Sequence, residues 1–157
     1  MTHHALECDR LLVRAGRRAI LDMPRLAIAQ GELVGLLGPH GAGKSTFLRC
    51  LLGMQPHVSG RVSVFGQDVR SFAPAALAAL RRRIGFVPQR LAAHSGMPLT
   101  VREVVAIGRT ASAGLLRPLR PIDWRIVDEW IERLGLTSLA RRGFTEISGG
   151  EQRKTLI

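Results

Sequence analysis

The sequence predicts an α/β fold, and three patterns along the chain lead to that prediction. Residues 32–37 form an apolar run of strand length, and a glycine-rich stretch and a helical pattern follow it directly. Residues 58–66 alternate between apolar and polar side chains, which is typical of a β-strand. From Thr100 onward the apolar residues recur at helical spacing instead. We therefore expect a β-rich part over residues 1–89 and an all-helical part over residues 90–157.

The glycine-rich stretch, residues 38–46, matches the pattern Gly-x4-Gly-Lys-Ser/Thr of a phosphate-binding loop. Its glycines allow successive backbone N–H groups to turn into one concavity for phosphate oxygens. Lys44 adds a positive charge for the β- and γ-phosphates, and the hydroxyl of Ser45 can hold Mg²⁺. A helix that follows such a loop directs its positive end at the phosphates. The sequence therefore predicts a nucleoside triphosphate site formed by Gly38, Pro39, His40, Gly41, Ala42, Gly43, Lys44, Ser45 and Thr46.

The rest of the β-rich part follows from local patterns. We expect a strand over residues 6–13, a turn at 16–18, and a second β region over 19–28 that Pro24 interrupts. The helix after the glycine-rich loop should end at Gly53. A second helix over residues 71–83 has Pro74 near its start, and residues 84–87 should form another buried strand.

The helical part contains two clear helix starts. Thr100 and Glu103 form a capping box that opens a helix over residues 101–107, and a loop over 114–121 follows. Asp123 is expected to cap a helix over 124–134, and a short helix covers 137–140.

A second anion-binding helix end is predicted near the C-terminus. Ser148 and Glu151 form another capping box, and Gly149 and Gly150 leave the first-turn N–H groups uncovered. Such a turn is usually only a helix cap, but about a hundred residues earlier the chain carries a phosphate-binding loop. We therefore interpret Ser148, Gly149, Gly150 and Glu151 as a second phosphate-binding segment.

Composition limits the classes of protein that remain. The formal net charge is +11 and comes almost wholly from arginine, because Lys44 and Lys154 are the only lysines. Aromatic residues make up 4% of the chain, so stacking platforms for single-stranded nucleic acid are scarce. No apolar run reaches the roughly 18 residues of a membrane span, and the N-terminus lacks the pattern of a signal peptide. Cys8 and Cys50 fit no metal-binding spacing, and we interpret them as reduced thiols.

Together these motifs resemble those of the nucleotide-binding subunits of ATP-binding cassette (ABC) transporters. Residues 38–46 resemble the Walker A motif, Gln89 after Phe86-Val87-Pro88 resembles the Q-loop, and residues 147–153 resemble the family signature. The resemblance implies a P-loop NTPase fold, with a RecA-like core, an N-terminal antiparallel β region and an α-helical subdomain. It also implies an ATP hydrolase with ATP and Mg²⁺ as cofactors, in which Lys44 and Gln89 are catalytic and Ser45 and Gln89 hold the Mg²⁺.

The same resemblance implies the partners. ATP would lie in a homodimer, between the phosphate-binding loop of one subunit and the signature residues Ser148, Gly149, Gly150 and Glu151 of the other. A membrane permease would bind the helical subdomain, and a substrate-binding protein would act indirectly. The expected location is the cytoplasmic face of the cell membrane, with no nucleic acid as a partner.

The cargo is less sharply indicated by the sequence. Residues 101–109 and the helix after Asp123 look most like importers of metal ions, iron chelates or cobalamin. The alternative is a soluble ABC-type ATPase that acts on nucleic acid or ribosomes, where the arginine excess would contact nucleic acid. The single short helical insert favours the importer.

Several departures from the family pattern lead to further expectations. Ala15 stands where the family places an aromatic ring that stacks on adenine, His40 where asparagine is frequent, and Glu151 where glutamine is frequent. No Walker B strand or switch histidine follows the signature, so we expect a fragment that is incomplete at its C-terminus and inactive by itself. Residues 126–129 resemble Walker B superficially, but they lie on an amphipathic helical pattern and read as a solvated helix face.

Overall fold

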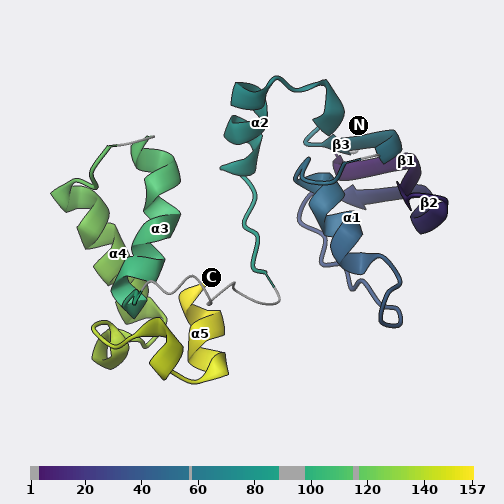
Figure 1. Cartoon of the computed structure of the whole chain (residues 1–157). Coiled ribbons are helices and arrows are strands. Elements are labelled where there is room, and N and C mark those ends of the chain that lie inside the picture. The colour runs from purple at the N-terminus through teal and green to yellow at the C-terminus, as the bar shows by residue number, and fades with distance from the viewer. Residues whose placement is uncertain (1–3, 57, 89–97, 115–116) are drawn as a thin grey trace. The chain divides into compact units, whose positions relative to one another are not determined.

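The chain forms two compact units, Met1–Arg81 and Arg82–Ile157, in the computed structural model (Figure 1). The structure describes residues 4–56, 58–88, 98–114 and 117–157. The predicted division into residues 1–89 and 90–157 stays a prediction about the complete domain.

The first unit is built on an antiparallel sheet, as the sequence predicts. Its strands are β1 (His4–Ala15), β2 (Arg18–Ala29), β3 (Val58–Val64) and the short β4 (Gln67–Asp68), in the order β2-β1-β3-β4. Along β1 the buried side chains are Leu6, Cys8, Leu11 and Val13. The spacing widens by one residue between Cys8 and Leu11, and the register with β3 shifts between Asp9 and Leu12. This bulge keeps both halves of β1 directed at one core.

The second β region is one continuous strand rather than two pieces interrupted by Pro24. Among the described strands, β2 lies at the edge of the sheet and pairs with β1 alone. A proline is tolerated in an edge strand, where the N–H that it lacks would face away from the neighbouring strand. The predicted interruption at Pro24 is therefore wrong.

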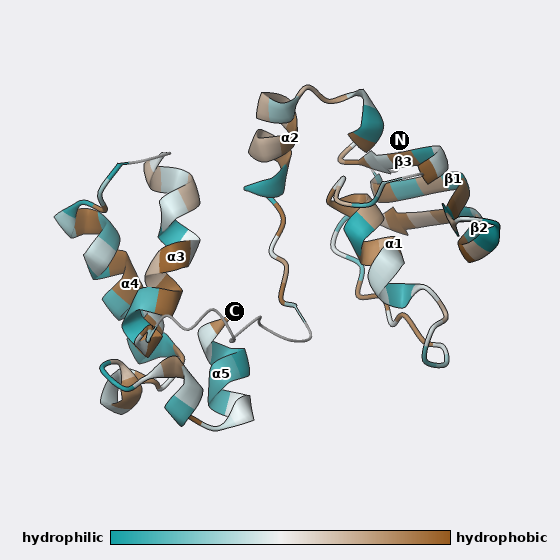
Figure 2. Cartoon of the chain, in the orientation of Figure 1, coloured by the Kyte–Doolittle hydropathy of each residue, from teal (hydrophilic) through white to brown (hydrophobic). Residues whose placement is uncertain are grey.

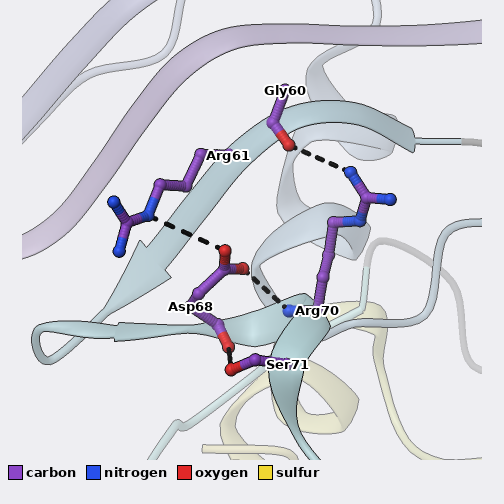
Figure 3. A network of polar contacts seen from close by, with 5 residues as sticks. All are labelled: Gly60, Arg61, Asp68, Arg70 and Ser71. Atoms are coloured by element: carbon purple, nitrogen blue, oxygen red, sulfur yellow. Dashed lines mark hydrogen bonds and ion pairs between the residues drawn. The ribbon is translucent and has the colours of Figure 1, made fainter.

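A group of polar contacts fixes the hairpin between β3 and β4 (Figure 3). The Asp68 carboxylate accepts a hydrogen bond from the Arg70 backbone N–H at 3.0 Å and lies 3.7 Å from Nε of Arg61. The Ser71 hydroxyl donates to the Asp68 carbonyl at 2.8 Å, and Arg70 donates to the Gly60 carbonyl at 3.0 Å. Together they hold the 3₁₀ turn Val69–Ser71 against β3.

Two helices complete the first unit. α1 (Lys44–Leu51) contacts β2 and β3 and buries Phe47 and Cys50, and α2 (Pro74–Arg81) buries Leu80. Cys8 and Cys50 are both free and buried. Burial raises the pKa of the Cys8 thiol to about 11, so it stays protonated at neutral pH.

Two predicted buried strands, residues 32–37 and 84–87, are wrong for this structure. Neither segment pairs with a strand, and the side chains of Leu33 and Leu37 are 99% and 92% exposed. Both segments are strongly apolar, as the mostly brown trace after α2 illustrates (Figure 2). An apolar run becomes a buried strand only where other strands supply its hydrogen bonds, and no strand described in the first unit pairs with residues 32–37.

The second unit is helical, as predicted. Its elements are α3 (Val101–Ala113), α4 (Pro121–Arg133), the 3₁₀ turns Thr137–Leu139 and Phe144–Glu146, and α5 (Gly149–Thr155). One cluster of buried residues joins them: Val101, Ala106, Val127, Ile131, Leu136, Phe144 and Ile147.

Two helix boundaries in this unit differ from the prediction. α3 continues six residues beyond Ile107, and α4 begins at Pro121 rather than after Asp123. Asp123 is not the N-cap but the third residue of α4, where its carboxylate accepts from the Arg120 N–H at 3.0 Å. It also accepts from Arg109 of α3 at 2.8 Å, although its side chain is only 1% exposed. This pair, in which Asp123 is buried and Arg109 is partly exposed, holds the second half of α3 against α4, which explains why α3 is longer than predicted.

Candidate nucleotide-binding site

The N-terminal end of α1 is open to an anion. Its N-cap is Gly43, no side chain caps it, and its first turn has no acidic residue. The first turn closes when the Phe47 N–H donates to the Gly43 carbonyl at 2.8 Å. The preceding N–H groups, those of Lys44, Ser45 and Thr46, have no acceptor within the helix. Three N–H groups at the positive end of a helix dipole form a site for phosphate oxygens.

Gly43 anchors this end of α1 against β2. Its φ is +83°, and an ideal Cβ there would lie 2.7 Å from the Ile20 carbonyl oxygen and 3.2 Å from Cδ1 of Leu21. Both the backbone conformation and the close approach therefore require glycine. The contact fixes where the first-turn N–H groups point.

Lys44 closes the glycine-rich loop. Its ammonium group donates to the carbonyl of Gly38 at 2.6 Å and to that of Pro39 at 2.7 Å. The Ala42 N–H also donates to the Pro39 carbonyl, at 3.3 Å. The loop thus turns its carbonyls toward the lysine, whose third N–H is available to a ligand. The positive charge is held beside the open helix end.

The metal-binding predictions are only partly covered by the structure. Ser45 is exposed at the first turn of α1, where its hydroxyl oxygen is the kind of hard ligand that Mg²⁺ prefers. Gln89, the other predicted ligand and catalytic residue, lies outside the described residues. Across the part of the chain that is described, no cluster of three or more His, Cys, Asp or Glu residues could hold a metal ion. The loop and Ser45 fit a magnesium nucleotide, with further metal ligands supplied by phosphate and water.

The predicted second phosphate-binding segment lies at the start of α5, in the second unit. Ser148 is the N-cap: its hydroxyl accepts from the Glu151 N–H at 3.3 Å and donates to the Glu151 carboxylate at 2.6 Å. That carboxylate also accepts from the Ser148 N–H at 2.8 Å. The hydroxyl and N–H of Ser148 lower the pKa of Glu151, so the carboxylate is ionised at neutral pH. Gly149 and Gly150 are exposed, with open space where a Cβ would lie.

Two further sequence interpretations can be compared with the structure. Ala15 ends β1, pairs with Arg18 and is exposed, so it offers no ring to a base. Residues 126–129 lie on α4, where the Asp128 carboxylate binds Arg102 of α3 at 2.6 and 2.9 Å. Asp128 is therefore an exposed member of an ion pair between helices, which confirms the interpretation as a helix face.

Sequence reasoning missed one residue that contacts the chain at the end of α1 opposite this site. Arg81, the last residue of α2, donates from Nε to the Leu52 carbonyl at 2.7 Å and from Nη2 to the Gly53 carbonyl at 3.1 Å. These carbonyls lie at the C-terminal end of α1. The sequence shows only a run of three arginines, residues 81–83, and nothing in it distinguishes the one that reaches α1.

Comparison with known proteins decides the family. The family model described as "ABC transporter" matches residues 21–157, which is most of the chain. The chain belongs to the ABC transporter family. The predicted P-loop NTPase fold is confirmed.

Three similar relatives carry names of import systems. A manganese transport system ATP-binding protein of Bacillus subtilis is 32% identical over 97% of this chain and 58% of its own length. A zinc transport system ATP-binding protein of Treponema pallidum is 36% identical, over 99% of this chain and 56% of its own. A cobalamin import ATP-binding protein of Halobacterium salinarum is 41% identical, over 91% and 34%. The ABC sequence thus spans little more than half of the metal-transport relatives.

A solved structure agrees with the ABC fold. A transporter described as an ABC transporter of metal-chelate type, in an inward-facing conformation, is 27% identical to this chain with a TM-score of 0.76. The match covers 98% of this chain and 54% of that one. Among the described residues of this ABC chain, none of the helices is long and apolar enough to cross a membrane.

Proposed function

We propose that this chain is the ATP-binding part of a subunit whose ATP hydrolysis drives import of a metal ion or iron chelate through a separate membrane permease. One observation carries the proposal: the N-terminal end of α1 is uncapped, with Lys44 folded over the loop beside it. A helix end with free N–H groups and a nearby ammonium suits the phosphates of ATP.

Each residue of the site has a proposed role. The N–H groups of Lys44, Ser45 and Thr46 would bind phosphate oxygens. The loop residues Gly38, Pro39, His40, Gly41, Ala42 and Gly43 would surround the phosphates. Lys44 would neutralise charge on the β- and γ-phosphates, while Ser45 and Gln89 would hold Mg²⁺. Bound Mg-ATP supplies the phosphoryl group that is transferred to water. Lys44 is proposed as catalytic because it would stabilise charge that develops on the transferred group.

The proposed assembly is a homodimer of such subunits. The first unit has one helix end suited to phosphate, and the second has Ser148, Gly149, Gly150 and Glu151 at the start of α5. If two subunits are arranged head to tail, each ATP would contact the loop of one and the signature of the other. A permease would join this dimer at the cytoplasmic face of the membrane, and a substrate-binding protein would deliver the cargo.

The proposed cargo rests on the printed functions of the relatives. Manganese and zinc transport are named for two of them and cobalamin import for a third. The nucleic-acid alternative gains no support from these relatives.

A deletion strain tests this function. Cells lacking the gene should accumulate less manganese, zinc or iron, and the complete protein should restore the metal content measured by mass spectrometry. Lys44→Ala should fail to restore it. Arg49→Ala is the matched control because Arg49 is an exposed cation at the opposite end of α1. Equal restoration by parent and Lys44→Ala would refute ATP-driven import, and unchanged metal and cobalamin content in the deletion strain would refute the cargo.

A further inference from the structure

The C-terminal end of α1 is held by Arg81, a residue with no part in the predicted site. Four carbonyls at and just beyond this end accept hydrogen bonds. The Arg49 and Cys50 carbonyls accept from the N–H groups of Met54 and Gly53, at 2.9 and 3.0 Å. The Leu52 and Gly53 carbonyls accept from the two arms of the Arg81 guanidinium, at 2.7 and 3.1 Å. Arg81 therefore binds the two residues that directly follow the helix.

The contact depends on a close approach of α2 at Gly53. An ideal Cβ on Gly53 would lie 3.0 Å from Cδ1 of Leu77 and 3.0 Å from Cγ1 of Val69, and its φ is +60°. Leu77 lies one helical turn before Arg81 on α2, so both residues face the end of α1. Leu80 is buried beside them. The position of Arg81 is thus set by apolar packing rather than by a flexible side chain alone.

The guanidinium group also suits this place electrostatically. A positive charge at the C-terminal end of a helix interacts favourably with the helix dipole. The guanidinium holds its donors in one fixed plane that matches the two carbonyls, whereas a lysine ammonium is a point charge on a flexible stem. Arg81 and the phosphate site therefore act on opposite ends of one eight-residue helix.

We propose that Arg81 is a positioning residue for phosphate binding and acts through α1. Gly43 fixes the N-terminal end of α1 against β2, and Arg81 with Leu77 fixes the other end. With both ends held, the N–H groups of Lys44, Ser45 and Thr46 keep the direction that phosphate oxygens require. Without Arg81, α1 tilts about its Gly43 contact, and the N–H groups of Lys44, Ser45 and Thr46 no longer point at the phosphate oxygens. This inference rests on the proposed nucleotide-binding function.

Titration calorimetry on the complete protein tests the proposal. Mg-ATP and tripolyphosphate should bind Arg81→Ala roughly tenfold more weakly than the parent, the lower end of the losses caused by removing outer-shell partners of bound ions. Arg81→Lys, which keeps the charge but not the fork, should lie between them. Arg82→Ala is the matched control, since Arg82 is exposed and no partner for it is seen in the described part of the chain. It removes the same charge one residue away and should bind like the parent.

The measurements are made at a temperature where circular dichroism shows every variant folded. If Arg81→Ala has a lower Tm but unchanged affinity for Mg-ATP, Arg81 is only structural. If Arg81→Ala and Arg82→Ala lose equal affinity, the effect is one of general charge. Either result overturns the proposal. If Arg81→Ala does not fold, parent-like affinity in Arg81→Lys overturns it. If the parent itself binds no Mg-ATP, the proposed function fails, and the amide NMR shifts of Lys44–Thr46 decide about Arg81. These amide shifts should change in Arg81→Lys and stay unchanged in Arg82→Ala. Unchanged shifts in Arg81→Lys would overturn the inference.

Discussion

Replacing Lys44 should weaken nucleotide binding more than any other single change in the loop. Its ammonium group donates to the carbonyls of Gly38 and Pro39 within 2.7 Å. Lys44 is the one lysine in the first unit. A hydrogen bond from a charged group contributes about 1.5–3 kcal/mol net. If one such bond to the phosphates is lost, Kd for Mg-ATP should rise about 10- to 150-fold. Loss of the two carbonyl contacts also loosens the loop, so the upper part of this range is expected.

Isothermal titration of the complete protein with Mg-ATP measures this effect. Lys44→Met keeps most of the side-chain length without the charge, and Lys44→Ala removes both. Arg49→Ala controls for loss of a positive charge elsewhere on α1 and should change Kd less than about twofold at physiological salt, where distant exposed charges are screened. Parent-like affinity in both Lys44 variants would show that the phosphates bind elsewhere.

Four other predictions follow from particular side chains. Because Ala15 has no ring, ATP and GTP should compete within a few-fold, and Ala15→Tyr should tighten ATP binding by up to the roughly 1–3 kcal/mol of a stacked base; strong ATP preference in the parent would contradict this. Arg102 binds Asp128 and lies 4.4 Å from the Trp124 ring, so in thermal denaturation Arg102→Ala should cost about 1–2 kcal/mol and Asp128→Asn less than about 1; equal costs would exclude the ring contact. The Arg109 guanidinium holds the pKa of Asp123 below its ordinary value, so the ionised Asp123 carboxylate stabilises the fold at neutral pH, and this stabilisation should be lost as pH falls below about 4. If the free energy of unfolding of Asp123→Asn changes with acid pH as steeply as that of the parent, this prediction is wrong. The 157-residue chain alone, with Leu33 and Leu37 exposed, should aggregate or melt broadly without ATP turnover; one sharp calorimetric transition with turnover that depends on Lys44 would refute this.

The candidate site was predictable from sequence because its geometry is local. Residues 38–46 are contiguous, and the direction of their N–H groups follows from the glycines and the start of α1. The capping boxes at Thr100 and Ser148 are local in the same sense, and both form as predicted. A three-residue spacing contains all the information that such a cap needs.

The start of α4 shows how a tertiary contact changes a local prediction. Asp123 has the side chain of an N-cap, yet it lies inside the helix, because Pro121 can occupy the first turn and Arg120 can supply the cap backbone. Its carboxylate then points at Arg109, fourteen residues earlier on α3. No local pattern indicates that partner. The length of α3 depends on the same contact, so the predicted end of α3 and the predicted start of α4 are wrong for one shared reason.

The apolar runs at residues 32–37 and 84–87 show the limit of reading burial from hydropathy. A continuous apolar run indicates that the free energy of the chain falls when both faces of the segment leave water. It does not state which chain covers those faces, because the partner of a strand is chosen by backbone hydrogen bonds with another segment. In the described residues of the first unit the sheet is antiparallel and ends at β2 and β4, and residues 32–37 do not join it. The apolar side chains of these runs therefore remain exposed, although their burial would be favourable. Other contacts hold α1: Gly43 lies against β2 at one end, and Arg81 binds at the other end.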